Sequence, residues 1–155
     1  MCVLFYTIAK AIRRIYLSGT NFEELFKAKN QDEPLISRMS RFRKEFIKNM
    51  DPHNTKHIAD MEGGSAAKRL NMFLRWMVRK GSPVDIGIWS ELINQRTLIM
   101  PLDTHVIQQA MQLGLLKSKS ATMVAARRLT EELATFFPED PLKADFALFG
   151  YGVNL

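Results

Sequence analysis

Residues 101–105 read Pro-Leu-Asp-Thr-His and include the side chains of this chain that are best placed to do chemistry. Asp103 comes directly before an apolar periodic run, so its carboxylate can cap a helix by accepting hydrogen bonds from the amides of the first turn. A carboxylate held at a helix start, beside a cleft and a basic surface, can also stabilise a cation that forms during a reaction. The segment alone leaves both roles open for Asp103, whereas His105 is expected to be a structural hydrogen-bonding residue.

A glycine-rich turn at Gly63, Gly64 and Ser65 leads into a second segment that could do chemistry. A helix that begins at such a turn offers unpaired backbone amides to an anion. The apolar residues that follow form one stripe along the helix. The basic residues expected to surround that stripe are Lys68, Arg69, Arg75, Arg79 and Lys80. This basic set is either a phosphate-binding surface or an ordinary solvated face.

Helices must position these residues, because apolar side chains recur at spacings of three and four and no stretch alternates as a strand would. The pattern predicts helices over residues 3–16, 22–26, 36–50, 66–80, 103–113, 121–136 and 141–149, with a short helical turn at 86–92. The fold class is therefore all-α, a helical bundle. Thr20, Ser120 and Asp140 are the expected N-caps, and Gly114 is an expected C-terminal cap.

At 155 residues, of which 46% are hydrophobic, the chain is long enough to bury a sizeable core. We expect a single all-helical domain over residues 1–155, with N-terminal helices and a loop in 1–62 and the glycine turn and Asp103 helix in 63–155. Trp89 is expected to lie in the core. Lys and Arg outnumber Asp and Glu by 22 to 16, and the net charge of +6 favours a polyanionic partner such as nucleic acid. The solvent side of the predicted 36–50 helix is strongly basic.

Several classes of protein are excluded by the rest of the composition. Cys2 is the only cysteine, so this chain can form neither an internal disulfide nor a cysteine-based metal or iron–sulfur site, and a reducing, cytoplasmic setting is expected. His53 and His57 lie in a polar segment and are expected to be solvated loop residues, with no metal bound. The N-terminal segment reads as neither a signal peptide nor a membrane span, so no membrane partner is expected.

The order of these features resembles the helix-hairpin-helix DNA glycosylase superfamily, which includes endonuclease III and the 8-oxoguanine glycosylases. Residues 102–106, Leu-Asp-Thr-His-Val, resemble the catalytic aspartate motif of that superfamily. Residues 64–68, Gly-Ser-Ala-Ala-Lys, stand where the hairpin Gly-x-Gly-x-Lys would lie, and residues 143–152 resemble the closing helix behind the site. The likeness covers residues 63–154 and is closest to an uncharacterised bacterial branch of unknown function within the superfamily.

The resemblance implies a DNA repair enzyme that cleaves the N-glycosidic bond of a damaged or mismatched base in double-stranded DNA. Asp103 would stabilise the sugar cation, and Lys68 would either attack the sugar as a Schiff-base nucleophile or contact a phosphate. Gly63, Gly64 and Ser65 would bind a backbone phosphate through their amides, while a basic set would supply charge. The members of that set are Arg69, Arg75 and Arg79. No cofactor is implied, and the expected protein is a cytoplasmic bacterial monomer.

Three departures from the superfamily pattern bear on this interpretation. Ala66 replaces the second hairpin glycine, which weakens a turn that needs positive φ. The interval between Lys68 and Asp103, 34 residues, is an insertion relative to endonuclease III, and the iron–sulfur loop is absent. The chain is short for a two-lobed enzyme, so we expect a fragment or a minimal form that lacks part of one lobe. The alternatives are a noncatalytic helical DNA-binding module and a basic protein that binds RNA or an acidic protein.

Overall fold

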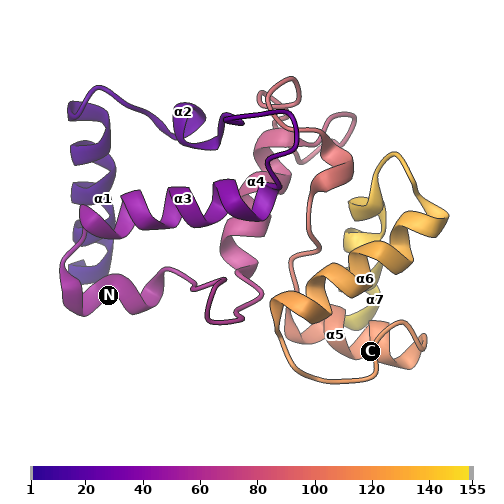
Figure 1. The fold of residues 1–155 in the computed structure, drawn as a ribbon. Coiled ribbons are helices and arrows are strands. Elements are labelled where there is room, and N and C mark those ends of the chain that lie inside the picture. The colour runs from indigo at the N-terminus through magenta and orange to yellow at the C-terminus, as the bar shows by residue number, and fades with distance from the viewer. Residues whose placement is uncertain (1, 154–155) are drawn as a thin grey trace. The chain divides into compact units, whose positions relative to one another are not determined.

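The computed structural model describes residues 2–153, and within that range the chain is helical (Figure 1). The only pairing of extended backbone among the described residues is an isolated antiparallel bridge between Ser65 and Thr122. The predicted all-α class is therefore confirmed. The chain divides into two compact units, Met1–Glu62 and Gly63–Leu155, which are described separately below.

The first unit is built from three α-helices and a 3-10 helix, in which α3 packs against both α1 and α2 (Figure 1). Its elements are α1 (Cys2–Leu17), α2 (Phe22–Phe26), α3 (Leu35–Lys48) and η1 (Pro52–His57). Phenylalanine rings fill the space between α2 and α3: the Phe26 and Phe42 rings stack at 4.9 Å, and Phe22 meets Phe42 edge-on at 5.0 Å. Aromatic pairs of this kind contribute about 0.5–1.5 kcal/mol beyond the burial of their area.

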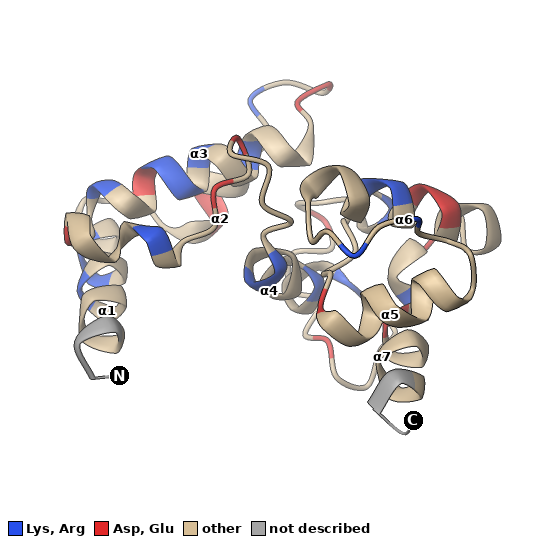
Figure 2. Ribbon diagram, turned by 90° about the horizontal axis from the view of Figure 1, so that it is seen from below, with Lys and Arg blue, Asp and Glu red and all other residues tan. Residues whose placement is uncertain are grey.

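Acidic side chains of the same unit pair with most of the basic side chains of α3. Figure 2 shows acidic and basic residues interleaved along this helix. Arg41 forms an ion pair with Glu33 at 2.5 Å, and Lys48 forms one with Glu45 at 3.0 Å. Two further pairs are Arg43–Asp60 and Lys44–Glu62. The sequence predicted a strongly basic surface here, and the ion pairs reduce that charge. Glu45 belongs to α3 itself, whereas Glu33, Asp60 and Glu62 come from the segments before and after it.

The second unit contains the segments that the sequence marked for chemistry, and α5 lies alongside α7 within it (Figure 1). Its elements are α4 (Lys68–Val78), η2 (Gln95–Thr97), α5 (Thr104–Gln112), α6 (Met123–Phe136), η3 (Pro141–Ala144) and α7 (Asp145–Val153). Residues with almost no exposed surface come from helices and connectors alike: Leu74, Ile93, Leu98, Met100, Leu102, Leu129 and Leu142. These side chains hold the connector before α5 in place.

The connector between α4 and α5 folds back on the end of α4. The amides of Ile86 and Gly87 donate to the carbonyl of Trp76 at 2.7 and 3.0 Å, and the amide of Trp89 donates to Met77 at 2.7 Å. Gly87 has a φ of +69°, and a Cβ there would stand 3.0 Å from the carbonyl oxygen of Arg79, so only glycine fits. The predicted helical turn at 86–92 is present in part, because the amides of Leu92 and Ile93 both donate to the carbonyl of Trp89 at 3.0 Å. The core position of Trp89 is confirmed at 6% exposure.

Helix ends were predicted less well than helix positions. Asn21 caps α2 in place of Thr20, and Thr122 caps α6 in place of Ser120, with its hydroxyl accepting from the amide of Ala125 at 3.2 Å. The predicted C-terminal glycine, Gly114, follows α5 with a φ of +74°, which confirms it. Asp140 precedes η3, but its carboxylate does not cap that helix, because it binds an arginine side chain described below.

Neither a membrane-spanning nor a metal-binding feature is found in residues 2–153. None of the helices formed there combines the length and apolar character needed to cross a bilayer. No group of three or more His, Cys, Asp or Glu side chains in the same range is arranged to hold a metal ion. His53 and His57 lie on the 3-10 helix η1 rather than in an irregular loop.

Candidate functional site

Lys68 and Asp103, which the sequence singled out separately, meet in the structure. The Nζ atom of Lys68 lies 3.4 Å from Oδ2 of Asp103, although the two residues stand on different helices. Lys68 is the first residue of α4, and Asp103 is the N-cap of α5. The starts of two helices therefore converge on one acidic and one basic side chain.

The carboxylate of Asp103 makes two contacts, and one of them is the helix cap that the sequence predicted. Its Oδ1 atom accepts a hydrogen bond of 2.8 Å from the amide of Val106, which is the capping contact, while Oδ2 faces Lys68. The Asp103 side chain is 13% exposed and the Lys68 side chain 48% exposed. The pair is thus partly desolvated on the carboxylate side and open to solvent on the lysine side, where a ligand can approach.

The aromatic ring of His105 contacts α7 close to this pair. Its ring meets Phe149 edge-on, with 5.8 Å between the two centroids and an angle of 84° between the planes. This packing holds the first turn of α5 against α7. It favours the structural role that the sequence predicted for His105.

The glycine turn is held against the segment that precedes α6. The amide of Met123 donates to the carbonyl of Gly64 at 2.9 Å, and the amide of Ala66 donates to that of Ala121 at 3.3 Å. The hydroxyl oxygen of Ser65 accepts from the amide of Ala67 at 3.2 Å. The turn therefore has a defined shape before any ligand binds, and Gly63 and Gly64 are exposed on it.

Backbone strain in this turn falls on Ala67, the residue directly before Lys68. Ala67 has φ +47° and ψ +43°, the left-handed conformation that costs a residue with a Cβ about 1–2 kcal/mol. The sequence predicted that Ala66 would be the strained residue of the turn, whereas in the structure the positive φ is found at Ala67. The side-chain amide of Asn71 donates to the carbonyl of Ala66 at 2.8 Å, and Asn71 is 1% exposed, so this buried amide helps to hold the turn.

Asn71 was not among the residues predicted from the sequence to form the site. An asparagine inside an amphipathic helix is read as a solvated polar residue, and nothing in its spacing indicates a bond to the preceding turn. The sequence could have indicated Asn71 only through its spacing from Lys68, because a residue three positions after Lys68 lies on the same face of the helix.

The expected positions of Arg75 and Arg79 on the solvated side of α4 are wrong. Both side chains are nearly inaccessible, at 3% and 9% exposure. Nε of Arg75 donates to Asp85 at 3.1 Å and its Nη1 atom binds Asp145, while Arg79 binds Asp85 at 3.0 Å and Asp140 at 2.8 Å. Neither arginine is available to a phosphate.

This buried network explains the error physically. Lys68, Arg75 and Arg79 lie on one face of α4, and each of them pairs with at least one carboxylate. Buried guanidinium groups are tolerated when carboxylates satisfy them, so a helical pattern that counts arginine as polar cannot distinguish a solvated position from a paired one. The Arg75 guanidinium also lies over the Phe146 ring, 4.4 Å from its centroid.

The buried arginine network and the Lys68–Asp103 pair are close enough to interact electrostatically. Burial raises the pKa of the Asp145 carboxyl above its usual range, Arg75 opposes that rise, and the charge of Asp103 adds to it. The hydrogen bond that Arg79 donates to the Asp140 carboxylate raises the pKa of Arg79, which stays charged. Of the basic residues predicted to contact DNA, Lys68 and Arg69 remain exposed, at the start of α4.

The comparison with protein families covers both units of the chain. A family model described as "Protein of unknown function (DUF2400)" matches residues 4–154. The chain belongs to the DUF2400 family. No curated protein and no solved structure matches the chain significantly. The matched range contains Lys68, Asp103 and the glycine turn, so this DUF2400 protein has its candidate site inside the family region.

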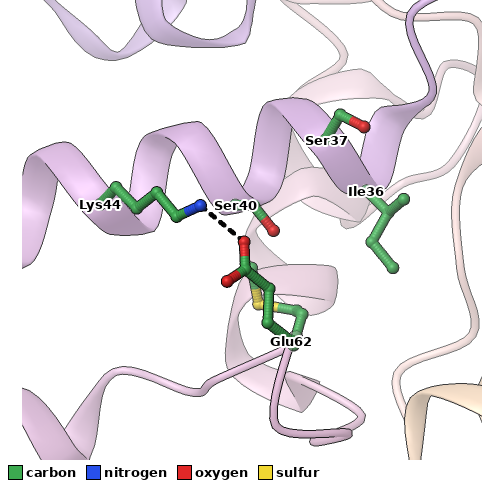
Figure 3. Close-up of a pocket in the computed structure, with 6 residues that line it drawn as sticks. Ile36, Ser37, Ser40, Lys44 and Glu62 are labelled. Carbon is green, nitrogen blue, oxygen red and sulfur yellow. Dashed lines mark ion pairs between the residues drawn. The ribbon is translucent and has the colours of Figure 1, made fainter.

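This DUF2400 protein also has a pocket of about 420 Å³ in its first unit, which the sequence did not predict (Figure 3). The side chains that line it are Ile36, Ser37, Ser40, Lys44, Met61 and Glu62. Figure 3 shows Lys44 and Glu62 pointing toward one another, and their charged atoms lie 2.7 Å apart. The pocket contains none of the residues singled out for catalysis, and its two charges compensate each other.

Proposed function

We propose that this DUF2400 protein is a DNA base-excision enzyme of the helix-hairpin-helix glycosylase type. It cleaves the N-glycosidic bond between deoxyribose and a damaged or mismatched base in double-stranded DNA. The observation that carries the proposal is the 3.4 Å approach of Lys68 Nζ to Asp103 Oδ2 at the converging starts of α4 and α5. We further propose that the protein is monomeric and acts in a bacterial cytoplasm.

Asp103 acts on the charge that develops as the glycosidic bond breaks. The capping contact to Val106 fixes the orientation of the carboxylate, and the other oxygen is directed to the side where Lys68 lies. A preorganised carboxylate of low exposure stabilises a sugar cation more strongly than a solvated one, because little solvent screens it. This stabilisation arises only as the bond breaks, which is what raises the rate.

Lys68 is the candidate for a following lyase step at the abasic sugar. Its amine nitrogen attacks C1′ of the open-chain aldehyde, a carbon–nitrogen bond forms, and loss of water leaves a Schiff base. The ammonium must first lose a proton, and the Asp103 carboxylate is within reach to accept it. The half-exposed position of Lys68 supports access for the sugar.

The turn before α4 is the proposed contact with the DNA backbone. Gly63, Gly64 and Ser65 form the turn that leads into Lys68, the two glycines are exposed on it, and Arg69 adds an exposed positive charge. Ala67, at the N-cap, has no polar side chain with which to occupy the first-turn amides. A phosphate is a natural partner for such a helix start. Arg75 and Arg79 are left out of this surface because they are buried.

A noncatalytic helical DNA-binding module is the second candidate function. The ion pair itself favours it, because the carboxylate of Asp103 is already compensated by a cation of the same chain. The two candidates share a DNA-binding surface and differ in chemistry alone.

The experiment that tests the proposed function is incubation of the protein with a panel of duplexes that each contain one lesion or mismatch. Base release is detected by cleaving the DNA strand at the abasic site that it leaves. We expect release from at least one duplex of the panel. Binding to all duplexes with no base release from any of them would support the noncatalytic module instead.

The lyase step makes a separate prediction about Lys68. Borohydride reduction of a reaction with an abasic duplex should trap a covalent adduct with the native protein, and Lys68→Ala should abolish that adduct. Lys80→Ala is the matched control, because Lys80 lies beyond the opposite end of α4 and pairs with Glu91 at 2.6 Å. An adduct that persists in Lys68→Ala would show that another amine reacts, and Lys68 would then be a phosphate contact.

A further inference from the structure

A loop that the sequence did not connect with the site lies directly beside the glycine turn. We call residues 117–121, Lys-Ser-Lys-Ser-Ala, the strap. The carbonyl of Ala121 accepts the amide of Ala66 at 3.3 Å, and the next residue, Thr122, bridges to Ser65. These backbone contacts hold the end of the strap against the turn that leads into Lys68.

The strap also contains two lysines that form no ion pair with any described residue. In the part of the second unit that the structure describes, the ion pairs engage Lys68, Arg75, Arg79, Lys80, Arg96 and Arg127. Lys117 and Lys119 form none of these pairs, nor does Arg69 beside the turn, and all three are exposed. Uncompensated positive charge therefore lies on both of the segments that meet at the Ser65–Thr122 bridge.

The internal geometry of the strap is ordered by serine side chains. The Ser118 hydroxyl accepts from the amide of Ser120 at 3.2 Å and contacts the Ser120 hydroxyl at 3.1 Å. Two residues of extended chain span at most about 7 Å, so Lys117 and Lys119 can stand no farther apart than that along the backbone.

We propose that the strap is a second phosphate-binding element, which together with Arg69 and the glycine turn follows the backbone of one DNA strand past the Lys68–Asp103 pair. The inference rests on the DNA binding of the proposed function and is independent of its catalytic step. The ligand is the phosphodiester backbone, so the contact is insensitive to base sequence and sensitive to salt.

The test is the salt dependence of binding to an undamaged short duplex, measured by fluorescence anisotropy with the full chain. Lys117→Ala/Lys119→Ala should reduce the magnitude of the negative slope of log K against log salt by roughly 1.8, which is about 0.9 for each phosphate that the variant no longer neutralises. Lys80→Ala/Lys143→Ala is the matched control. It removes the same charge at the other end of α4, where Lys80 follows the helix and Lys143 lies in η3 beside Asp140, and it should leave the slope unchanged.

A slope that stays unchanged in Lys117→Ala/Lys119→Ala would overturn the inference. If both double variants reduce the magnitude of the slope equally, the effect is one of net charge and the strap is not a binding element. If native protein binds the duplex without salt dependence, both the strap and the proposed DNA function are wrong. If the strap variant alone reduces the magnitude of the slope but no lesion is processed, the inference stands and the glycosylase chemistry is wrong. Equal melting temperatures of the variants exclude misfolding as the cause.

Discussion

Replacement of Asp103 by asparagine is expected to reduce base release by about 10²–10³-fold while duplex binding stays within roughly threefold. Asparagine retains an oxygen that can accept the Val106 amide, so the cap of α5 survives, and only the negative charge is removed. The comparison therefore separates the electrostatic role of the carboxylate from its structural role. Single-turnover base release and anisotropy, on a duplex that the native protein processes, measure the two quantities.

Asp103→Ala provides the complementary control. It removes both the charge and the cap, so the free energy of unfolding should fall by about 1 kcal/mol in Asp103→Ala and change little in Asp103→Asn. Base release by Asp103→Asn at the native rate would reduce Asp103 to a helix cap. The proposed function would then have no catalytic carboxylate at this position.

Replacement of Arg75 by methionine is expected to destabilise the protein by about 3–5 kcal/mol, measured by urea unfolding. The substitution leaves Asp145 and Asp85 buried with less compensation, although the volume of the side chain is largely kept. Arg69→Met is the matched control on the exposed face of the same helix, and it should change the stability by less than about 0.5 kcal/mol. Equal effects of the two substitutions would contradict the buried network.

The pH dependence of the Arg75→Met effect follows from the carboxyl that loses its partner. Burial already raises the pKa of Asp145, and removal of Arg75 takes away the charge that opposes this rise. A carboxyl with a raised folded-state pKa stabilises the fold when it is protonated, and that contribution is lost as the pH rises through the folded-state pKa. The destabilisation should therefore be largest at neutral pH and should shrink on acidification.

The positions of the helices could be predicted from the sequence because an apolar stripe is sufficient to specify a helix that packs on a core. The helix starts could not be predicted to the residue, since Thr20 and Asn21, or Ser120 and Thr122, are equally suitable caps by residue type. Tertiary contacts decide between them. At α6 the N-cap is Thr122, the residue whose backbone pairs with Ser65 in the isolated bridge.

The candidate site was predictable in part, for two different reasons. Asp103 as a helix cap follows from residue type and position, but its approach to Lys68 was expected only through the resemblance to glycosylases, because periodicity contains no information across 34 residues. The burial of Arg75 and Arg79 was missed because a helical pattern does not show which carboxylates pair with them. Asp85 follows α4 closely in the sequence, whereas Asp140 and Asp145 come from the starts of η3 and α7, and only Asp140 was assigned a role, that of a cap.

The central claim, that Asp103 compensates positive charge on a deoxyribose, can be measured without knowledge of the lesion. Two duplexes are compared, one with a cationic pyrrolidine in place of the sugar and one with a neutral tetrahydrofuran at the same site. We predict that native protein binds the cationic duplex at least tenfold more tightly, since analogues of a transition state bind about 10²-fold or more better than substrates. Asp103→Asn should lose this preference. Equal affinity of the native protein for the two duplexes would contradict the claim.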